Sequence, residues 1–181
     1  MRIIAGAAKS RTIEAPKGLD TRPTLDRVRE TVFDILQFEL ADACVLDLYA
    51  GSGAMALEAV SRGAKKAVLV HKDREAVRLI RKNIAALRFE EACAVLPMQD
   101  TAALDRLAEA GERFDIIFLD PPYRMDTNPV IASILEKWLL SANGVLCVEY
   151  DRIAPDAARG LSLWKERAIG QTRLRLFRRE E

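Results

Sequence analysis

The stretch CVLDLYAGSGAMALEAVSR, residues 44–62, contains an apolar run, a turn with two glycines and a helical sequence in direct succession. Residues 44–50 form the apolar run, whose continuous character is typical of a strand that is buried on both faces. Gly51 and Gly53 permit the positive φ angles of a tight turn, and ALEAVSR continues as a helix. A buried strand that leads directly into a helix is the repeating unit of a parallel α/β sheet, so this stretch predicts that fold class.

The sequence on the C-terminal side repeats the same alternation. Further strands are predicted at residues 67–70, 94–98, 114–120 and 144–150, with helices at 76–87, 101–110 and 129–140. Residues 172–180, TRLRLFRRE, alternate with a period of two, as a half-exposed antiparallel strand does. The whole pattern predicts a doubly wound α/β sheet, in which ligands bind beyond the carboxyl ends of the strands. The residues that directly follow each strand are therefore the candidates for function.

The first 40 residues differ from this pattern. Residues 2–5 and 11–14 are predicted to pair as a small hairpin, and apolar residues at helical spacing predict a helix over 24–40. Residues 1–30 contain seven cations and four acids, while the whole chain has a net charge of +1. On charge alone, this local excess fits an ordinary solvated surface as well as a surface that binds a polyanion.

Length and composition limit the classes of protein. The chain has 181 residues, half of them hydrophobic and 30% charged, which fits one soluble globular domain over residues 1–181. Within it we expect an N-terminal part over 1–40 and a core over 41–181. No apolar run approaches the roughly 20 residues of a membrane span, and the first residues lack the apolar core of a signal peptide. We therefore expect no membrane contact and a cytoplasmic location. The three cysteines show no metal-ligand spacing, so no metal site is expected.

The loop after the first strand, DLYAGSG, is a candidate for cofactor binding. Its glycines let a ligand approach the backbone, and a plain tight turn, a nicotinamide dinucleotide site and an S-adenosylmethionine site are all compatible with it. A dinucleotide site predicts an acid for the ribose about 20 residues further on, where the chain has His71 instead. Asp73 is the nearby acid that could replace it. After the third strand, Asp100 could accept a hydrogen bond from an adenine amino group, cap the following helix, or do both.

The fourth strand ends in an acid and two prolines, within FLDPPYRMD, residues 118–126. The two prolines alone would fit a plain strand terminator. An exocyclic base amine, however, is a poor nucleophile until it becomes pyramidal. The Asp120 carboxylate and a backbone carbonyl held rigid by Pro121 and Pro122 would accept its two N–H bonds and favour that geometry. Tyr123 can stack on a base that has left its helix. Nicotinamide chemistry has no use for this corner, so the combination favours S-adenosylmethionine over a dinucleotide.

The Asp-Pro-Pro-Tyr sequence resembles the catalytic motif of amino methyltransferases that act on adenine or guanine. The chain also carries MRIIAG at residues 1–6, RPTLDRVRETVFDIL at 22–36, LYAGSGAMALEAVSRGA at 48–64 and GQTRLRLFRRE at 170–180. With these, it resembles the bacterial 16S rRNA guanine-N2 methyltransferase family over nearly its full length. The resemblance implies S-adenosylmethionine-dependent methylation of the N2 amine of one guanine in 16S rRNA, free or within the 30S subunit. The fold expected is a class I, Rossmann-like methyltransferase fold: a seven-stranded, mostly parallel sheet with an antiparallel last strand, preceded by a β-hairpin and a helix.

Residue roles follow from the resemblance and from the positions at the strand ends. The catalytic residues are expected to be Asp120, Pro121, Pro122 and Tyr123. The cofactor contacts are expected to be Asp47, Tyr49, Gly51, Ser52, Gly53, His71, Asp73 and Asp100. The RNA contacts are expected to be Arg2, Lys9, Arg11, Arg22 and Arg27. His71 departs from the family, which usually carries Glu at that position, and this departure bears on ribose binding rather than on the chemistry.

Two other functions are compatible with parts of the sequence. An adenine-N6 methyltransferase of DNA or RNA shares the same Asp-Pro-Pro-Tyr corner, although the short chain offers no separate target-recognition domain. A non-catalytic RNA-binding assembly factor with a degenerate cofactor site is the second, because His71 stands where an acid is expected. For the methyltransferase we expect a monomer.

Overall fold

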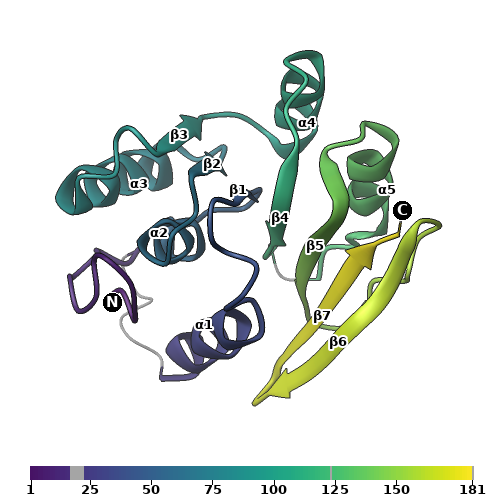
Figure 1. Ribbon diagram of the computed structural model, residues 1–181, viewed down its shortest axis with the longest axis horizontal. Coiled ribbons are helices and arrows are strands. Elements are labelled where there is room, and N and C mark those ends of the chain that lie inside the picture. Colours follow the sequence, from purple (N-terminus) through teal and green to yellow (C-terminus); the bar gives the residue numbers. More distant parts are fainter. Residues whose placement is uncertain (17–22, 123, 181) are drawn as a thin grey trace.

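A seven-stranded sheet runs through the molecule in the order β3-β2-β1-β4-β5-β7-β6 (Figure 1). The computed structural model describes residues 1–16, 23–122 and 124–180. The strands are β1 (Cys44–Asp47), β2 (Lys66–Val70), β3 (Cys93–Leu96), β4 (Phe114–Leu119), β5 (Leu140–Tyr150), β6 (Leu161–Ile169) and β7 (Thr172–Arg179). Strands β1 to β5 pair in parallel, whereas β7 runs antiparallel to both β5 and β6. The predicted sheet, with seven strands and an antiparallel last strand, is therefore confirmed.

Helices cover both faces of this sheet. They are α1 (Pro23–Ile35), α2 (Ala54–Ser61), α3 (Arg74–Leu87), α4 (Asp100–Glu109) and α5 (Asn128–Glu136). Buried side chains of α1, α2 and α3 pack on one face, in a core that includes Phe118 and Cys147. Those of α4 and α5 pack on the other face with Leu119 and Val148. Successive residues of a strand point to opposite faces, so the central strands contribute to both cores. None of the described helices is long and apolar enough to cross a membrane.

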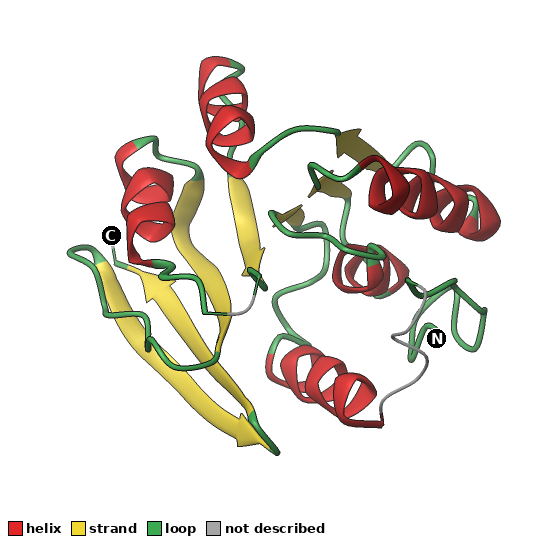
Figure 2. Ribbon diagram, turned by 180° about the vertical axis from the view of Figure 1, so that it is seen from behind, coloured by secondary structure: helices red, strands yellow, loops and turns green. Residues whose placement is uncertain are grey.

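The strands at one end of the sheet are longer than those in its middle, as Figure 2 shows in yellow. β5 has 11 residues, β6 has 9 and β7 has 8, against 4 in β1. The apolar pattern did not identify β6. Most of its side chains are exposed or half-buried, because it pairs only with β7 at the edge of the sheet. An edge strand of this kind has a weak apolar signal.

Residues 1–16, called the N-terminal segment below, turn back on themselves beside α2 in both views (Figures 1 and 2). The two arms of the segment pair in antiparallel fashion as predicted, but only through a single bridge between Arg2 and Thr12. Gly6 adopts a φ of 81°, and a Cβ there would lie 1.8 Å from the carbonyl oxygen of Ser61. Only glycine fits at this close approach.

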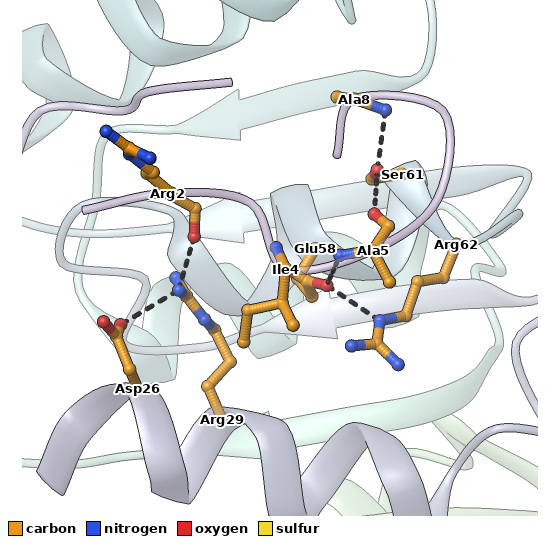
Figure 3. A network of polar contacts seen from close by, with 9 residues as sticks. All are labelled: Arg2, Ile4, Ala5, Ala8, Asp26, Arg29, Glu58, Ser61 and Arg62. Carbon is orange, nitrogen blue, oxygen red and sulfur yellow. Dashed lines mark hydrogen bonds and ion pairs between the residues drawn. The ribbon is translucent and has the colours of Figure 1, made fainter. Parts of the chain in front are cut away.

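Side chains of α2 hold the N-terminal segment against this helix (Figure 3). The backbone N–H groups of Ile4 and Ala5 donate to the two carboxylate oxygens of Glu58, at 2.8 and 3.0 Å. The N–H of Ala8 donates to the hydroxyl of Ser61 at 2.9 Å. These contacts give the backbone donors an acceptor and fix the segment to the helix.

Three predicted elements end three or more residues earlier in the structure. The helix predicted at 24–40 ends at Ile35, the strand predicted at 44–50 ends at Asp47, and the helix predicted at 129–140 ends at Glu136. Leu36 and Leu40 are buried although they lie beyond α1, while Phe38 between them is exposed. Apolar spacing reports which residues face the core, and here it continues through a turn.

Candidate active site

A pocket of about 990 Å³ opens at the carboxyl ends of the strands, and we call it the strand-end pocket. Its wall comes from the ends of β1, β2, β4 and β5, from α1 and from the N-terminal segment. The predicted site residues that line it are Asp47, Tyr49, Gly51, Ser52, His71, Asp100, Asp120, Pro121 and Pro122. Gly53 lies behind the wall as the N-cap of α2. The structure therefore brings the cofactor loop and the Asp-Pro-Pro corner into one cavity.

The glycine loop between β1 and α2 is fixed from both sides. Gly51 and Gly53 have φ angles of 55° and 83°, and a Cβ on Gly53 would lie 3.0 Å from Cδ2 of Leu69. The side-chain amide of Asn83, which is 1% exposed in α3, donates to the carbonyl of Ser52 at 2.9 Å. The same amide donates to a carbonyl of the N-terminal segment. The loop is thus held in one conformation before any ligand binds.

Asp47, at the end of β1, is a buried acid with spare hydrogen-bonding capacity. It is 2% exposed, and its Oδ2 has no hydrogen-bond partner among the described residues. Burial raises the pKa of Asp47 to about 7, and the neighbouring Asp120 adds to the rise. A buried carboxylate without a partner is unfavourable until a donor or a cation completes it. This position therefore suits a positively charged ligand group.

His71 and Asp73 follow β2, but only His71 lines the strand-end pocket. The backbone N–H of Gly51 donates to Nδ1 of His71 at 3.4 Å, which requires an unprotonated nitrogen. Burial lowers the pKa of His71, in agreement with a neutral ring. Asp73 is exposed and caps α3 by accepting the N–H of Ala76 at 3.0 Å. The structure thus gives Asp73 a structural partner and leaves His71 as the residue that faces the pocket.

Asp100 combines the two roles that its position allows. Its Oδ1 accepts the N–H of Thr101 at 2.8 Å in the first turn of α4. Its Oδ2 accepts the hydroxyl of Tyr49 at 2.6 Å, and this contact joins the loops that follow β1 and β3. Both side chains line the strand-end pocket.

The Asp-Pro-Pro corner begins directly after β4, which ends at Leu119. Asp120 is open to the pocket, yet the surrounding protein displaces enough water to raise its pKa to about 6. The carbonyl of Pro122 accepts the N–H of Met125 at 3.1 Å, which closes the turn behind the corner. Tyr123 lies outside the described residues, so its predicted stacking role stays a prediction.

The residues that are predicted to contact RNA differ in exposure and in their contacts within the protein. Arg2, Lys9 and Arg27 are exposed, as a surface that meets RNA requires. The guanidinium of Arg11 donates to two carbonyls at the C-terminal end of α3, so it also holds the N-terminal segment in place. Arg22 lies outside the described residues.

Two residues of the pocket wall were not identified from the sequence. Glu149 ends the apolar run of β5, and burial together with Asp120 raises its pKa to about 8. An acid at the carboxyl end of a buried strand is the pattern that identified Asp120 as a candidate, and the same pattern could have identified Glu149. Arg29 is 3% exposed in α1, donates to the carbonyl of Arg2 at 2.6 Å and pairs with Asp26 at 3.1 Å. No sequence pattern indicated its burial.

Comparison with known proteins agrees with this geometry. The family model described as "Conserved hypothetical protein 95" matches residues 1–178. Ribosomal RNA small subunit methyltransferase D of Escherichia coli (strain K12) is 37% identical over 184 residues, which cover 99% of this chain and 90% of that protein. Putative rRNA methyltransferase YlbH of Bacillus subtilis (strain 168) is 30% identical over 182 residues, with 99% of each chain covered.

The solved structure of the putative methyltransferase yhhF from Escherichia coli matches with a TM-score of 0.87 and 32% identity, over 99% of this chain and 98% of that chain. Its likeness confirms the class I methyltransferase fold predicted from the sequence. The match over residues 1–178 includes the N-terminal segment as well as the sheet. The chain therefore belongs to the family described as Conserved hypothetical protein 95.

Proposed function

We propose that this protein transfers the methyl group of S-adenosylmethionine to the exocyclic N2 of a guanine in the 16S rRNA of the small ribosomal subunit. The observation that carries the proposal is the meeting of Asp47, beside the glycine loop, with Asp120, at the Asp-Pro-Pro corner, in one pocket. Relatives named as small-subunit rRNA methyltransferases support RNA as the substrate, and the sequence resemblance supports N2 of guanine. The protein would meet free 16S rRNA or the 30S particle in the cytoplasm, as a single-domain monomer.

The residues of the strand-end pocket fit S-adenosylmethionine. Asp47 offers an unpartnered carboxylate oxygen to a cationic group, and the open side of Gly51 admits a ligand close to the backbone. His71, Tyr49 and Asp100 also line the pocket, and in this proposal His71 contacts the ribose while Tyr49 and Asp100 contact the adenine. When bound, the cofactor supplies a methyl group that its sulfonium makes electrophilic.

Asp120 prepares the nucleophile. Its carboxylate accepts one N–H of the guanine amine and the Pro121 carbonyl accepts the other, which frees the nitrogen lone pair from the ring. The prolines hold both acceptors in position before the base arrives. When the amine takes up the methyl group that bound S-adenosylmethionine would supply, one amine proton would pass to the Asp120 carboxylate. A carboxyl whose pKa is about 6 can accept that proton and release it again near neutral pH.

The N-terminal segment presents the RNA-facing surface in this proposal. Arg2 and Lys9 are exposed on it, and Arg27 is exposed on α1 beside it. Because Glu58 fixes the backbone of the segment to α2, the backbone that carries Arg2 and Lys9 is held beside the helix. Fixed cations of this kind orient an RNA strand through its phosphates without reading its sequence.

The direct test is methyl transfer from labelled S-adenosylmethionine to 30S particles that lack the modification, followed by mass spectrometry of the rRNA. We expect label at N2 of one guanine. Label on an adenine amine would identify the adenine-N6 alternative instead. Failure to bind the cofactor in calorimetry up to millimolar concentration would favour the non-catalytic assembly factor.

The rate of methyl transfer is expected to fall as the pH is lowered through about 6. The carboxylate of Asp120 is the active form, and burial raises its pKa from 3.8 to about 6, so protonation removes the acceptor at a higher pH than for an ordinary aspartate. Single-turnover rates with saturating cofactor and 30S particles should decrease about tenfold per pH unit below that value. The Asn side chain of Asp120→Asn does not take up a proton near pH 6, so the rate of this variant should not decrease below that pH. If its rate still decreased, the ionisation would belong to another group.

His71→Glu is expected to bind S-adenosylmethionine more tightly. A carboxylate accepts hydrogen bonds from both ribose hydroxyls, whereas a neutral imidazole accepts only one. We expect the dissociation constant from calorimetry to decrease about 3- to 10-fold, as for one added charged hydrogen bond. His71→Gln, which adds no charge, is the matched control and should stay close to wild type. An unchanged or weaker affinity in His71→Glu would show that residue 71 does not contact the ribose.

A further inference from the structure

Glu149 is the neighbour of Asp120 at the carboxyl ends of β4 and β5. In the register of these parallel strands Leu119 pairs with Val148, so Asp120 and Glu149 are the next residues along each strand. The side chains two positions earlier, Phe118 and Cys147, belong to the same core on the α1 side of the sheet. Side chains alternate along a strand, so Asp120 and Glu149 extend on that side too. Both line the strand-end pocket.

The order of the strands determines how a purine would lie in this pocket. The glycine loop and His71 follow β1 and β2, and Asp120 follows β4, which lies between β1 and β5. An amine held by Asp120 presents its lone pair, which is perpendicular to the ring, to the methyl donor on the β1 side. Its N–H bonds lie near the ring plane and point to Asp120 and the Pro121 carbonyl, so the N1–H and O6 of the same ring edge come beside Asp120. Glu149, at the end of the adjacent strand β5, is the acid at that place.

We propose that Glu149 reads the N1–H and O6 edge of the target guanine and so selects guanine over purines that lack these two groups. The inference rests on the proposed function, because it takes the base amine at Asp120 as its starting point. In guanine, the N1–H donor lies next to the amine and the O6 acceptor lies next to N1. A protonated carboxyl has one acceptor oxygen and one O–H donor side by side, and it matches this edge with two hydrogen bonds.

The electrostatics of the pocket support a protonated Glu149. Burial raises its pKa to about 8, and the charge of Asp120 adds to the rise. Asp120 is exposed to the pocket whereas Glu149 is half-buried, so the more enclosed Glu149 is the better position for a proton while Asp120 remains an acceptor. Asp120 thus accepts the amine, and Glu149 binds the N1–H and O6 edge of the ring.

The base analogue 2-aminopurine separates these roles. It has the same exocyclic amine at C2, but its N1 carries no hydrogen and its C6 carries no oxygen. Asp120 and the Pro121 carbonyl can hold its amine, whereas Glu149 can make at most one hydrogen bond to its ring. If Glu149 only stabilised the fold or shifted the pKa of Asp120, its substitution would slow methylation of guanine and of 2-aminopurine equally.

The experiment compares 30S particles reconstituted from 16S rRNA that carries either guanine or 2-aminopurine at the nucleotide identified by mass spectrometry. Wild type should prefer guanine in kcat/KM by about 5- to 150-fold, the discrimination of a bidentate base contact. Glu149→Leu should slow methylation of guanine and leave 2-aminopurine nearly unchanged, so that the ratio approaches one. Glu149→Gln should keep most of the preference, because its amide offers the same acceptor and donor.

Glu136→Leu, on the exposed side of α5, is the matched control and should keep the wild-type ratio. Equal losses on both bases in Glu149→Leu, or a wild-type ratio that persists in it, would overturn the inference. Absence of methyl transfer by wild type to the guanine particle would instead overturn the proposed function. Thermal melts establish that each variant is folded. A loss of the preference for guanine over 2-aminopurine in a folded variant then reflects a change in base recognition.

Discussion

Asp120→Ala is expected to lower the rate of methyl transfer to 30S particles by on the order of 100- to 1000-fold, the loss that follows removal of one preorganised group at a reacting centre. Alanine leaves one N–H of the guanine amine without an acceptor, so the nitrogen keeps its lone pair in the ring. Cofactor affinity should change little, because Asp47 and the glycine loop remain in place. Single-turnover rates and calorimetry on the same variant measure the two quantities separately.

Asp120→Asn sharpens this prediction. The amide oxygen still accepts one N–H but takes up no proton, so its rate should lie between those of alanine and wild type. Asp34→Ala, on the exposed surface of α1, serves as the control and should match wild type. If Asp120→Ala kept the wild-type rate, Asp120 would have no part in the chemistry, and the Asp-Pro-Pro corner would be only a strand terminator.

Glu58→Ala should produce the largest loss of stability that we predict. Glu58 is fully buried in α2, accepts the N–H groups of Ile4 and Ala5, and pairs with Nε of Arg62 at 2.8 Å. Its removal leaves two backbone donors and a guanidinium without their acceptor. Breaking a buried pair in this way costs about 3–5 kcal/mol. The free energy of unfolding, measured by urea titration, should decrease by that amount.

The same variant should also weaken binding to 16S rRNA, because the N-terminal segment loses its attachment to α2. Glu58→Gln, which keeps one acceptor oxygen, should show a smaller decrease in both measurements. Glu136→Ala removes an exposed glutamate and provides the matched control. A Glu58→Ala protein as stable as wild type would show that the buried carboxylate does not hold the segment.

Much of the central sheet could be predicted because its signals are local. Buried parallel strands carry continuous apolar runs, and helices repeat their apolar residues with their own period. Once the order of strands and helices is known, the rule that ligands bind beyond the carboxyl ends brings Asp47 and Asp120 together. The structure agrees, since both line one pocket. Residues separated by more than 70 positions were therefore placed together from strand ends alone.

The remaining features depend on contacts that leave no local pattern. The carboxylate of Glu58 bonds Ile4 across 54 residues, and nothing near either residue indicates the pairing. That contact attaches the N-terminal segment to α2. Asp73 caps α3 because its side chain reaches an N–H three residues on, a local option that competes with ribose binding. The strand β6 escaped notice because its exposure hides the alternation that marks inner strands.

The position of β7 has a consequence for the order in which the chain folds. β7 follows β6 in sequence but lies between β5 and β6 in the sheet, so β6 cannot join the sheet before β7 has been synthesised. Ile169 pairs directly with Thr172, and this tight turn lets β6 and β7 form a hairpin within microseconds and dock on β5 as one unit. Thr172 belongs to the wall of the strand-end pocket. The strand-end pocket is therefore completed only when this hairpin docks, and a nascent chain that still lacks β7 has no finished pocket.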